Sequence, residues 1–130
     1  MFRGKKYQDA VKQIEKNTHP QEQTVKDFLV EAAVTYILEH LQHKILIQDI
    51  CYNVGTNMST LNFRFRRTFN MSVGQYIVNE KMKKARHLLI GTTYSITEIA
   101  DRCGFENVYY FSRVFKRVTN MTPTDYKKSL

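Results

Sequence analysis

The sequence predicts an all-α fold, a seven-helix domain in which two helix-turn-helix subdomains are joined by a long connector helix. The chain of 130 residues contains only 2 prolines and 5 glycines, whereas an all-β fold needs many turns. Apolar residues recur with helical spacing over long stretches. A unit of about 30 residues also occurs twice in diverged form, which indicates a duplicated motif.

The first 23 residues are predicted to form a separate extension, and residues 24–130 the domain itself. Helical spacing over residues 6–17 favours a short helix in the extension. From Thr24 onward apolar residues recur at i, i+3, i+4 and i+7, which predicts a scaffold helix of roughly 18–20 residues. Thr24 and Asp27 have the spacing of a capping box at its start.

The internal repeat begins after this scaffold helix. The offset between the copies is 49 up to the shared glycine, and one extra residue in the second copy makes it 50 beyond that point. The aligned pairs are Ile47–Cys51 with Ile96–Ala100, Gly55 with Gly104, Phe65 with Phe115, and Tyr76 with Tyr126.

Each copy predicts a helix, a tight turn and a second helix, which is the helix-turn-helix plan, at residues 47–69 and 96–119. Ser95 and Glu98 form a capping box for the second copy, whereas Leu46 leaves the first copy poorly capped. The copies share a left-handed turn at Gly55 and Gly104, an N-cap at Asn57 and Asn107, and a left-handed stop at Asn70 and Asn120.

Two more helices are predicted by their caps. Ser72 begins the connector, residues 73–89, which Gly91 can end. Pro123 occupies the first position of a short terminal helix. A connector of about 17 residues is ~25 Å long, and successive major grooves lie about 34 Å apart. With its side chains and turns, one chain could therefore reach two adjacent grooves over about 20 base pairs, or bend the DNA to do so.

The second helix of a helix-turn-helix lies in the major groove, so its outward side chains are candidate base contacts. Arg113 suits the acceptor pair of guanine, and Asn62 the donor and acceptor of adenine. Phe63 or Val108 could pack on a thymine methyl. The candidates are Ser59, Thr60, Asn62 and Phe63 in the first copy, and Val108, Tyr109, Ser112 and Arg113 in the second.

Plainer interpretations of these positions stay open. Phe63 could pack against a neighbouring helix, and Arg113 could touch phosphate alone. Of the two adjacent tyrosines, Tyr110 is predicted to face the core and Tyr109 the solvent.

The net charge of +8 attracts polyanions. Both copies place a basic pair directly after the shared phenylalanine, which suits phosphates beside the groove. Amides after Ser72 could also hold phosphate, although a solvated face is the alternative for any one cation. The candidate phosphate contacts are Arg64, Arg66, Arg67, Ser72, Lys81, Lys116 and Arg117. Further basic residues of the connector, not assigned to phosphate, are Lys83, Lys84 and Arg86.

Other functions have weaker support in the sequence. Cys51 and Cys103 lack zinc-site spacing, so we expect buried apolar fillers in a reducing compartment. His40 and His43 could share a metal, but solvated positions at a helix end are favoured, and no metal or cofactor is expected.

No catalytic set appears at a usable spacing, so the chain is not expected to be an enzyme. Neither an apolar run of about 18 residues nor a secretory signal is present, which predicts a cytoplasmic protein without membrane contact.

The second copy resembles the AraC/XylS family of transcriptional regulators, a likeness that covers residues 24–130. The matching segments are Ser95–Ala100, Gly104–Phe105, Tyr110–Lys116, Met121–Pro123 and Tyr126. The resemblance implies a seven-helix domain that binds promoters through the positions above and usually activates RNA polymerase. Expected partners are therefore double-stranded DNA and RNA polymerase, at the bacterial nucleoid.

Longer family members often carry a separate sensor domain before this one. The chain is thus either a stand-alone regulator or a fragment without its sensor. A protein-interaction module with incidental charge is the competing hypothesis. The repeated basic pair after the shared phenylalanine favours DNA binding.

Overall fold

The computed structural model describes residues 27–130, and all regular elements in that range are α-helices. The predicted all-α class and the seven helices of the domain are confirmed. The N-terminal extension with its predicted short helix lies outside the described residues. The helices are α3 (Phe28–Glu39), α4 (Ile47–Val54), α5 (Met58–Phe69), α6 (Val73–Gly91), α7 (Ile96–Arg102), α8 (Val108–Thr119) and α9 (Pro123–Lys128).

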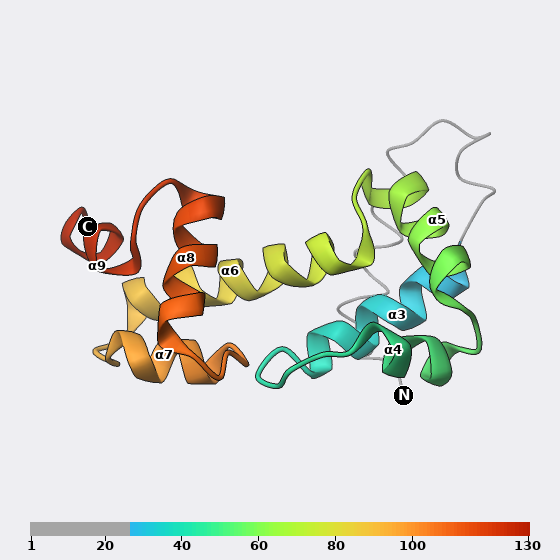
Figure 1. The fold of residues 1–130 in the computed structure, drawn as a ribbon, viewed down its shortest axis with the longest axis horizontal. Coiled ribbons are helices and arrows are strands. Elements are labelled where there is room, and N and C mark those ends of the chain that lie inside the picture. The colour runs from blue at the N-terminus through green and yellow to red at the C-terminus, as the bar shows by residue number, and fades with distance from the viewer. Residues whose placement is uncertain (1–26) are drawn as a thin grey trace.

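The helices form two units at opposite ends of α6 (Figure 1). The first unit is α3 to α5, and the second unit is α7 to α9. Each unit has its own hydrophobic core, and α6 contributes to both. Val73 and Ile77 belong to the core of the first unit, whereas Met82, Ala85 and Leu89 belong to the core of the second. The connector therefore changes partner between residues 77 and 82.

The sequence repeat corresponds to a repeat in packing. Phe65 and Phe115 are both fully buried. The ring of Phe65 meets Tyr76 edge-on, with centroids 5.4 Å apart and an interplanar angle of 77°. The ring of Phe115 meets Tyr126 at 5.6 Å and the same angle. The pairs aligned by sequence thus occupy equivalent places in the two cores.

The predicted glycine turns, asparagine N-caps and asparagine helix stops of the two copies are confirmed. Asn57 accepts a hydrogen bond from the Thr60 amide, and Asn107 accepts from two amides of α8. Leu46 supplies no side-chain cap to α4. Four residues adopt left-handed backbone conformations at the predicted places: Gly55 (φ 77°), Asn70 (φ 60°), Gly104 (φ 80°) and Asn120 (φ 66°).

Two predicted helix bounds are wrong. The scaffold helix α3 has 12 residues and begins after Asp27, whose carboxylate accepts from the amides of Leu29 and Val30. Asp27 is thus the N-cap itself rather than the third helical residue, which shortens the helix. The connector α6 continues to Gly91, because that glycine is helical and Thr92 provides the extended C-cap.

Both cysteines are free and buried, as predicted for apolar fillers. None of the described helices is long and apolar enough to cross a membrane.

Candidate nucleic-acid interface

The second helix of each helix-turn-helix has one buried face and one solvent face. Leu61 and Phe65 anchor α5 in the first core, and Phe111, Val114 and Phe115 anchor α8 in the second. Each helix carries three Arg or Lys residues and no acidic residue. Both helices run steeply to the axis of α6, one at each of its ends (Figure 1). The molecule thus presents two cationic helices on a shared support.

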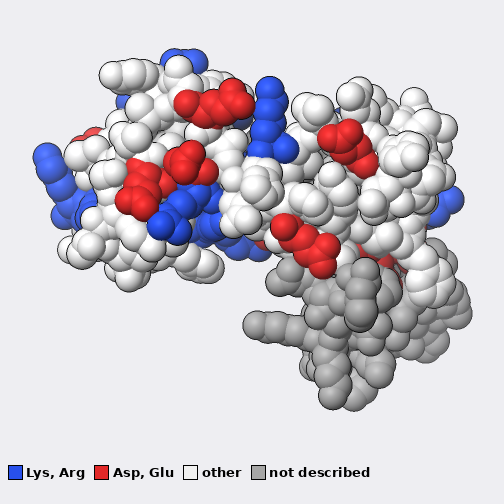
Figure 2. All heavy atoms as spheres, turned by 90° about the horizontal axis from the view of Figure 1, so that it is seen from below, with Lys and Arg blue, Asp and Glu red and all other residues white. Residues whose placement is uncertain are grey.

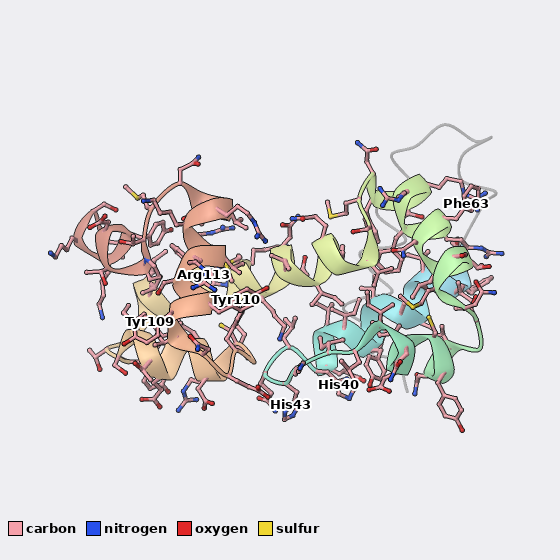
Figure 3. All side chains as sticks on the ribbon, viewed as in Figure 1. His40, His43, Phe63, Tyr109, Tyr110 and Arg113 are labelled. Carbon is pink, nitrogen blue, oxygen red and sulfur yellow. The ribbon has the colours of Figure 1, made fainter. Side chains whose placement is uncertain are left out.

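The outward face of α5 exposes one aromatic side chain, that of Phe63. Phe63 is 61% exposed, so the alternative in which it packs on a neighbouring helix does not hold in this structure. The Arg67 guanidinium lies over its ring, 5.4 Å from the centroid. Ser59 is exposed and Thr60 half-buried on the same helix. Figure 3 labels Phe63 at the outer edge of α5.

Asn62 has a structural role that corrects the prediction of an adenine contact. Its Oδ1 accepts a hydrogen bond from the Val73 amide at 2.9 Å, across the turn between α5 and α6. Bidentate pairing with adenine would need this oxygen as the acceptor for the base N6 amino group. The side chain instead ties α5 to the start of the connector.

We expect Asn62→Ala to lower the free energy of unfolding by about 1 kcal/mol, since a buried amide loses its acceptor. The preference of the variant for particular bases in its DNA site should stay as in the parent protein. Thermal denaturation together with a binding titration on matched and mutated duplexes checks both points. Loss of discrimination at a single adenine would restore the base-contact assignment.

The outward face of α8 includes one residue that the sequence interpretation placed wrongly. Tyr110 was predicted to face the core, yet it is 51% exposed, because the next residue, Phe111, takes the core position. Its ring lies 5.9 Å from that of Phe105, and the Arg113 guanidinium lies 5.6 Å from its centroid. Tyr109 is 75% exposed, as predicted. Tyr109, Tyr110 and Arg113 lie together on this helix (Figure 3).

Tyr110 is thus a candidate interface residue that the sequence analysis missed. Its i, i+3 spacing to Arg113 was the available signal. Val108 and Ser112, also predicted to contact bases, are half-buried on α8. Stacking beside Tyr110 restricts the directions in which the Arg113 side chain points.

The candidate phosphate contacts divide into free and paired cations. Arg66, Lys116 and Arg117 are exposed. Arg64 and Arg67 both reach the Asp27 carboxylate, at 3.2 Å and 3.8 Å, and thereby link α5 to the cap of α3. Sequence reasoning missed this pairing, because Asp27 is distant in the chain.

One predicted phosphate contact, Lys81, is wrong, and the atoms around a second, Ser72, are partly engaged within the protein. Lys81 is only 5% exposed, and its Nζ donates to the carbonyl oxygens of Leu41, His43 and Cys103. Burial lowers the pKa of Lys81 to about 8. At the start of α6, Ser72 accepts from the Gln75 amide, and the Val73 amide already bonds to Asn62. The amides of Val73 and Gln75, two of those proposed to hold phosphate there, are therefore occupied.

His40, one of the two histidines considered as metal ligands, contacts a neighbouring tyrosine. His40 stacks on Tyr36 with centroids 4.0 Å apart, and its Nδ1 lies 2.7 Å from the Tyr36 carbonyl oxygen. Among the described residues, no group of three or more His, Cys, Asp or Glu could hold a metal ion.

Charge is unevenly distributed over the surface. Figure 2 shows the molecule from below, and on this side several acidic side chains gather over the second unit. Glu98 and Asp101 on α7 and Glu106 after it are exposed. Glu98 holds Arg102 by an ion pair of 2.9 Å. The acids of the second unit thus lie on α7, in the loop after it and at Asp125 of α9, while α8 carries cations and no acid.

Comparison with known proteins decides the family. Residues 50–129 match the family described as a helix-turn-helix domain. The solved structure of an AraC-type regulator from Chromobacterium violaceum superimposes with a TM-score of 0.71 and 26% identity, covering 77% of this chain and 89% of that one. The chain belongs to the AraC/XylS family. Its helix-turn-helix pairs are therefore those of an AraC/XylS DNA-binding domain.

Two further comparisons match the chain to one part of a longer protein and to an isolated DNA-binding domain. The xylose operon regulatory protein of Escherichia coli is 36% identical over 104 residues, which are 80% of this chain and 26% of that protein. The chain thus spans about a quarter of the length of this curated relative. The DNA-binding domain of AdpA, solved in complex with a target DNA, has a TM-score of 0.74 and 27% identity, covering 80% of this chain and 93% of that one.

Proposed function

We propose that the protein is a sequence-specific transcriptional regulator that inserts α5 and α8 into adjacent major grooves of a promoter. The proposal depends on one observation, that α5 and α8 repeat the same design. Each of these two helices, here called the reading helices, has a buried apolar face and an outward face with cations and no acids. Activation through RNA polymerase is the usual mode of the family and is part of the proposal. The family's role in regulation argues against an enzyme.

Base contacts are proposed from the solvent faces of the two helices. Arg113 bonds to guanine from its place beside Tyr110, and Phe63 packs on a thymine methyl. The remaining base contacts are Ser59, Thr60, Val108, Tyr109 and Ser112. The phosphate contacts are Arg66, Lys116 and Arg117, with Arg64 and Arg67 at the edge of the first groove.

The length of α6 supports the use of two grooves. Its 19 residues give about 28 Å at 1.5 Å per residue. Adjacent major grooves on one face are about 34 Å apart, and bending the duplex to close such a gap costs a few kcal/mol. A modestly bent duplex therefore accepts both helices in this proposal.

The wider organisation follows from the same proposal. Residues 24–130 act as the DNA-binding domain, and residues 1–23 form an extension. Two modes of control fit this proposal: a sensor domain such as longer family members carry, or control through the abundance of a stand-alone regulator. The site of action is the cytoplasm at the bacterial nucleoid, where the promoter lies.

The test is a selection from a random duplex library with the purified chain, at two salt concentrations. Enrichment of one asymmetric motif of about 20 base pairs is expected. Binding of all sequences alike, with only a steep salt dependence, would reveal a generic polycation. No DNA binding at all would favour the protein-interaction module.

Arg113→Ala is expected to lose about 1–3 kcal/mol on the selected site, mostly at a single base pair. Lys116→Ala on the same helix is the control, because a phosphate contact should weaken binding equally on all sequences. Titration of both variants against single-base substitutions of the site gives the comparison. An equal loss on every duplex for Arg113→Ala would reduce Arg113 to a phosphate contact.

A further inference from the structure

A buried lysine connects the two units at the point where α6 changes partner. Lys81 lies between the residues that α6 gives to the first core and those it gives to the second. Its Nζ donates to the carbonyl oxygens of Leu41 at 2.7 Å and His43 at 2.7 Å, both after α3 of the first unit. It also donates to that of Cys103 at 2.8 Å, after α7 of the second. The three protons of one ammonium thus serve both units.

Gly104 brings the two backbones together at the same place. A Cβ at this position would lie 2.5 Å from the His43 carbonyl oxygen and 2.5 Å from the Lys81 Nζ. The loop after α3 can therefore meet the turn after α7 only because this residue has no side chain. Figure 1 shows these two segments approaching each other beneath α6.

Few other contacts fix one unit relative to the other. In the part of the chain that the structure describes, the helices of each unit pack chiefly on one another and on α6. A cleft beside the junction is lined from both units, by residues that include Ile45 and Phe105. The orientation of α5 relative to α8 therefore depends on α6 and on the junction at which Lys81 is bonded and Gly104 meets His43.

We infer that Lys81 is a positioning residue for DNA binding, which fixes the orientation of α5 relative to α8 and so sets the spacing of the two half-sites. This inference rests on the proposed binding to two grooves. A shift of one base pair turns one groove by about 35° relative to the other, since B-DNA has 10–10.5 base pairs per turn. A rigid pair of helices cannot follow that rotation, whereas a loosened pair can.

The first test needs no DNA. Residual dipolar couplings of the full chain report whether the two units share one alignment tensor. Lys81→Met removes the three hydrogen bonds and should give two different tensors. Lys83→Met is the matched control, because Lys83 lies on the same helix, is exposed and pairs with Glu80. The parent chain and Lys83→Met should each give a single tensor.

The second test measures affinity for duplexes whose half-sites are moved apart by one or two base pairs. For each base pair of added spacing, the affinity of the parent chain and of Lys83→Met should fall about 10-fold. The affinity of Lys81→Met should fall less than about 3-fold per base pair, and its affinity at the best spacing should be lower than that of the parent chain. Affinity for an isolated half-site should be equal in all three chains. Lys81→Gln, a milder change with fewer donors, repeats both readouts if the methionine variant does not fold.

The outcomes separate the two ideas. A single tensor together with an unchanged spacing preference in the Lys81 variants would overturn the role of Lys81. If the parent chain itself showed no spacing preference, binding to two grooves would fail, and the tensors would still decide whether Lys81 holds the units together.

Discussion

Gly104→Ala is expected to lower the free energy of unfolding by about 3–5 kcal/mol, whereas Gly55→Ala should lower it by only about 1–2 kcal/mol. The two glycines occupy equivalent turns and have nearly the same backbone angle, with φ of 80° and 77°. A Cβ at Gly55 would meet nothing within 4 Å, but one at Gly104 would meet the His43 carbonyl and Lys81. Both variants lose stability through backbone strain, so the difference between their free energies of unfolding measures the close contact of Gly104 with His43 and Lys81.

Urea denaturation of the two variants beside the parent chain gives this difference directly. Gly104→Ala should also speed hydrogen exchange at the amides of the loop after α3, although that loop belongs to the first unit. Equal losses in the two variants would mean that the backbones do not approach closely at the junction.

Phe65→Ala and Phe115→Ala should each cost about 3–5 kcal/mol, the usual loss for a buried phenylalanine. Both rings are fully buried, and each lies in a different core. Because each unit has a separate core and α6 contributes different residues to each, each change should open mainly its own unit. Hydrogen exchange should therefore rise in α4 and α5 for Phe65→Ala, and in α7 and α8 for Phe115→Ala.

Phe63→Ala is the matched control, because this ring on the same helix as Phe65 is 61% exposed. Its stability should change by less than about 1 kcal/mol. Faster exchange in both units after either buried substitution would show one cooperative core in place of two.

The features that could be predicted from the sequence are local ones. Asn57, Asn70 and their partners in the second copy act on backbone atoms a few residues away, so their residue types alone indicate caps and turns. The repeat strengthened these predictions, since two independent segments had to agree. The seven helices and the two reading helices followed from this pattern.

The features that were missed depend on contacts distant in the chain. The carbonyl groups bonded to Lys81 belong to residues about 20 or 40 positions away, and nothing near Lys81 in the sequence indicates them. The pairing of Arg64 with Asp27 is of the same kind. Tyr110 was misplaced for a different reason: three consecutive aromatic residues left the core register ambiguous, and Phe111 took the buried place.

The simultaneous use of two grooves is tested most directly by footprinting the full chain on its selected duplex. Hydroxyl-radical protection and guanine-methylation interference should reveal two contacted major-groove tracts on one face, centred about 10 base pairs apart. Arg113→Ala should weaken only the tract that faces α8. A single protected tract, with the neighbouring groove fully reactive at saturating protein, would contradict the account.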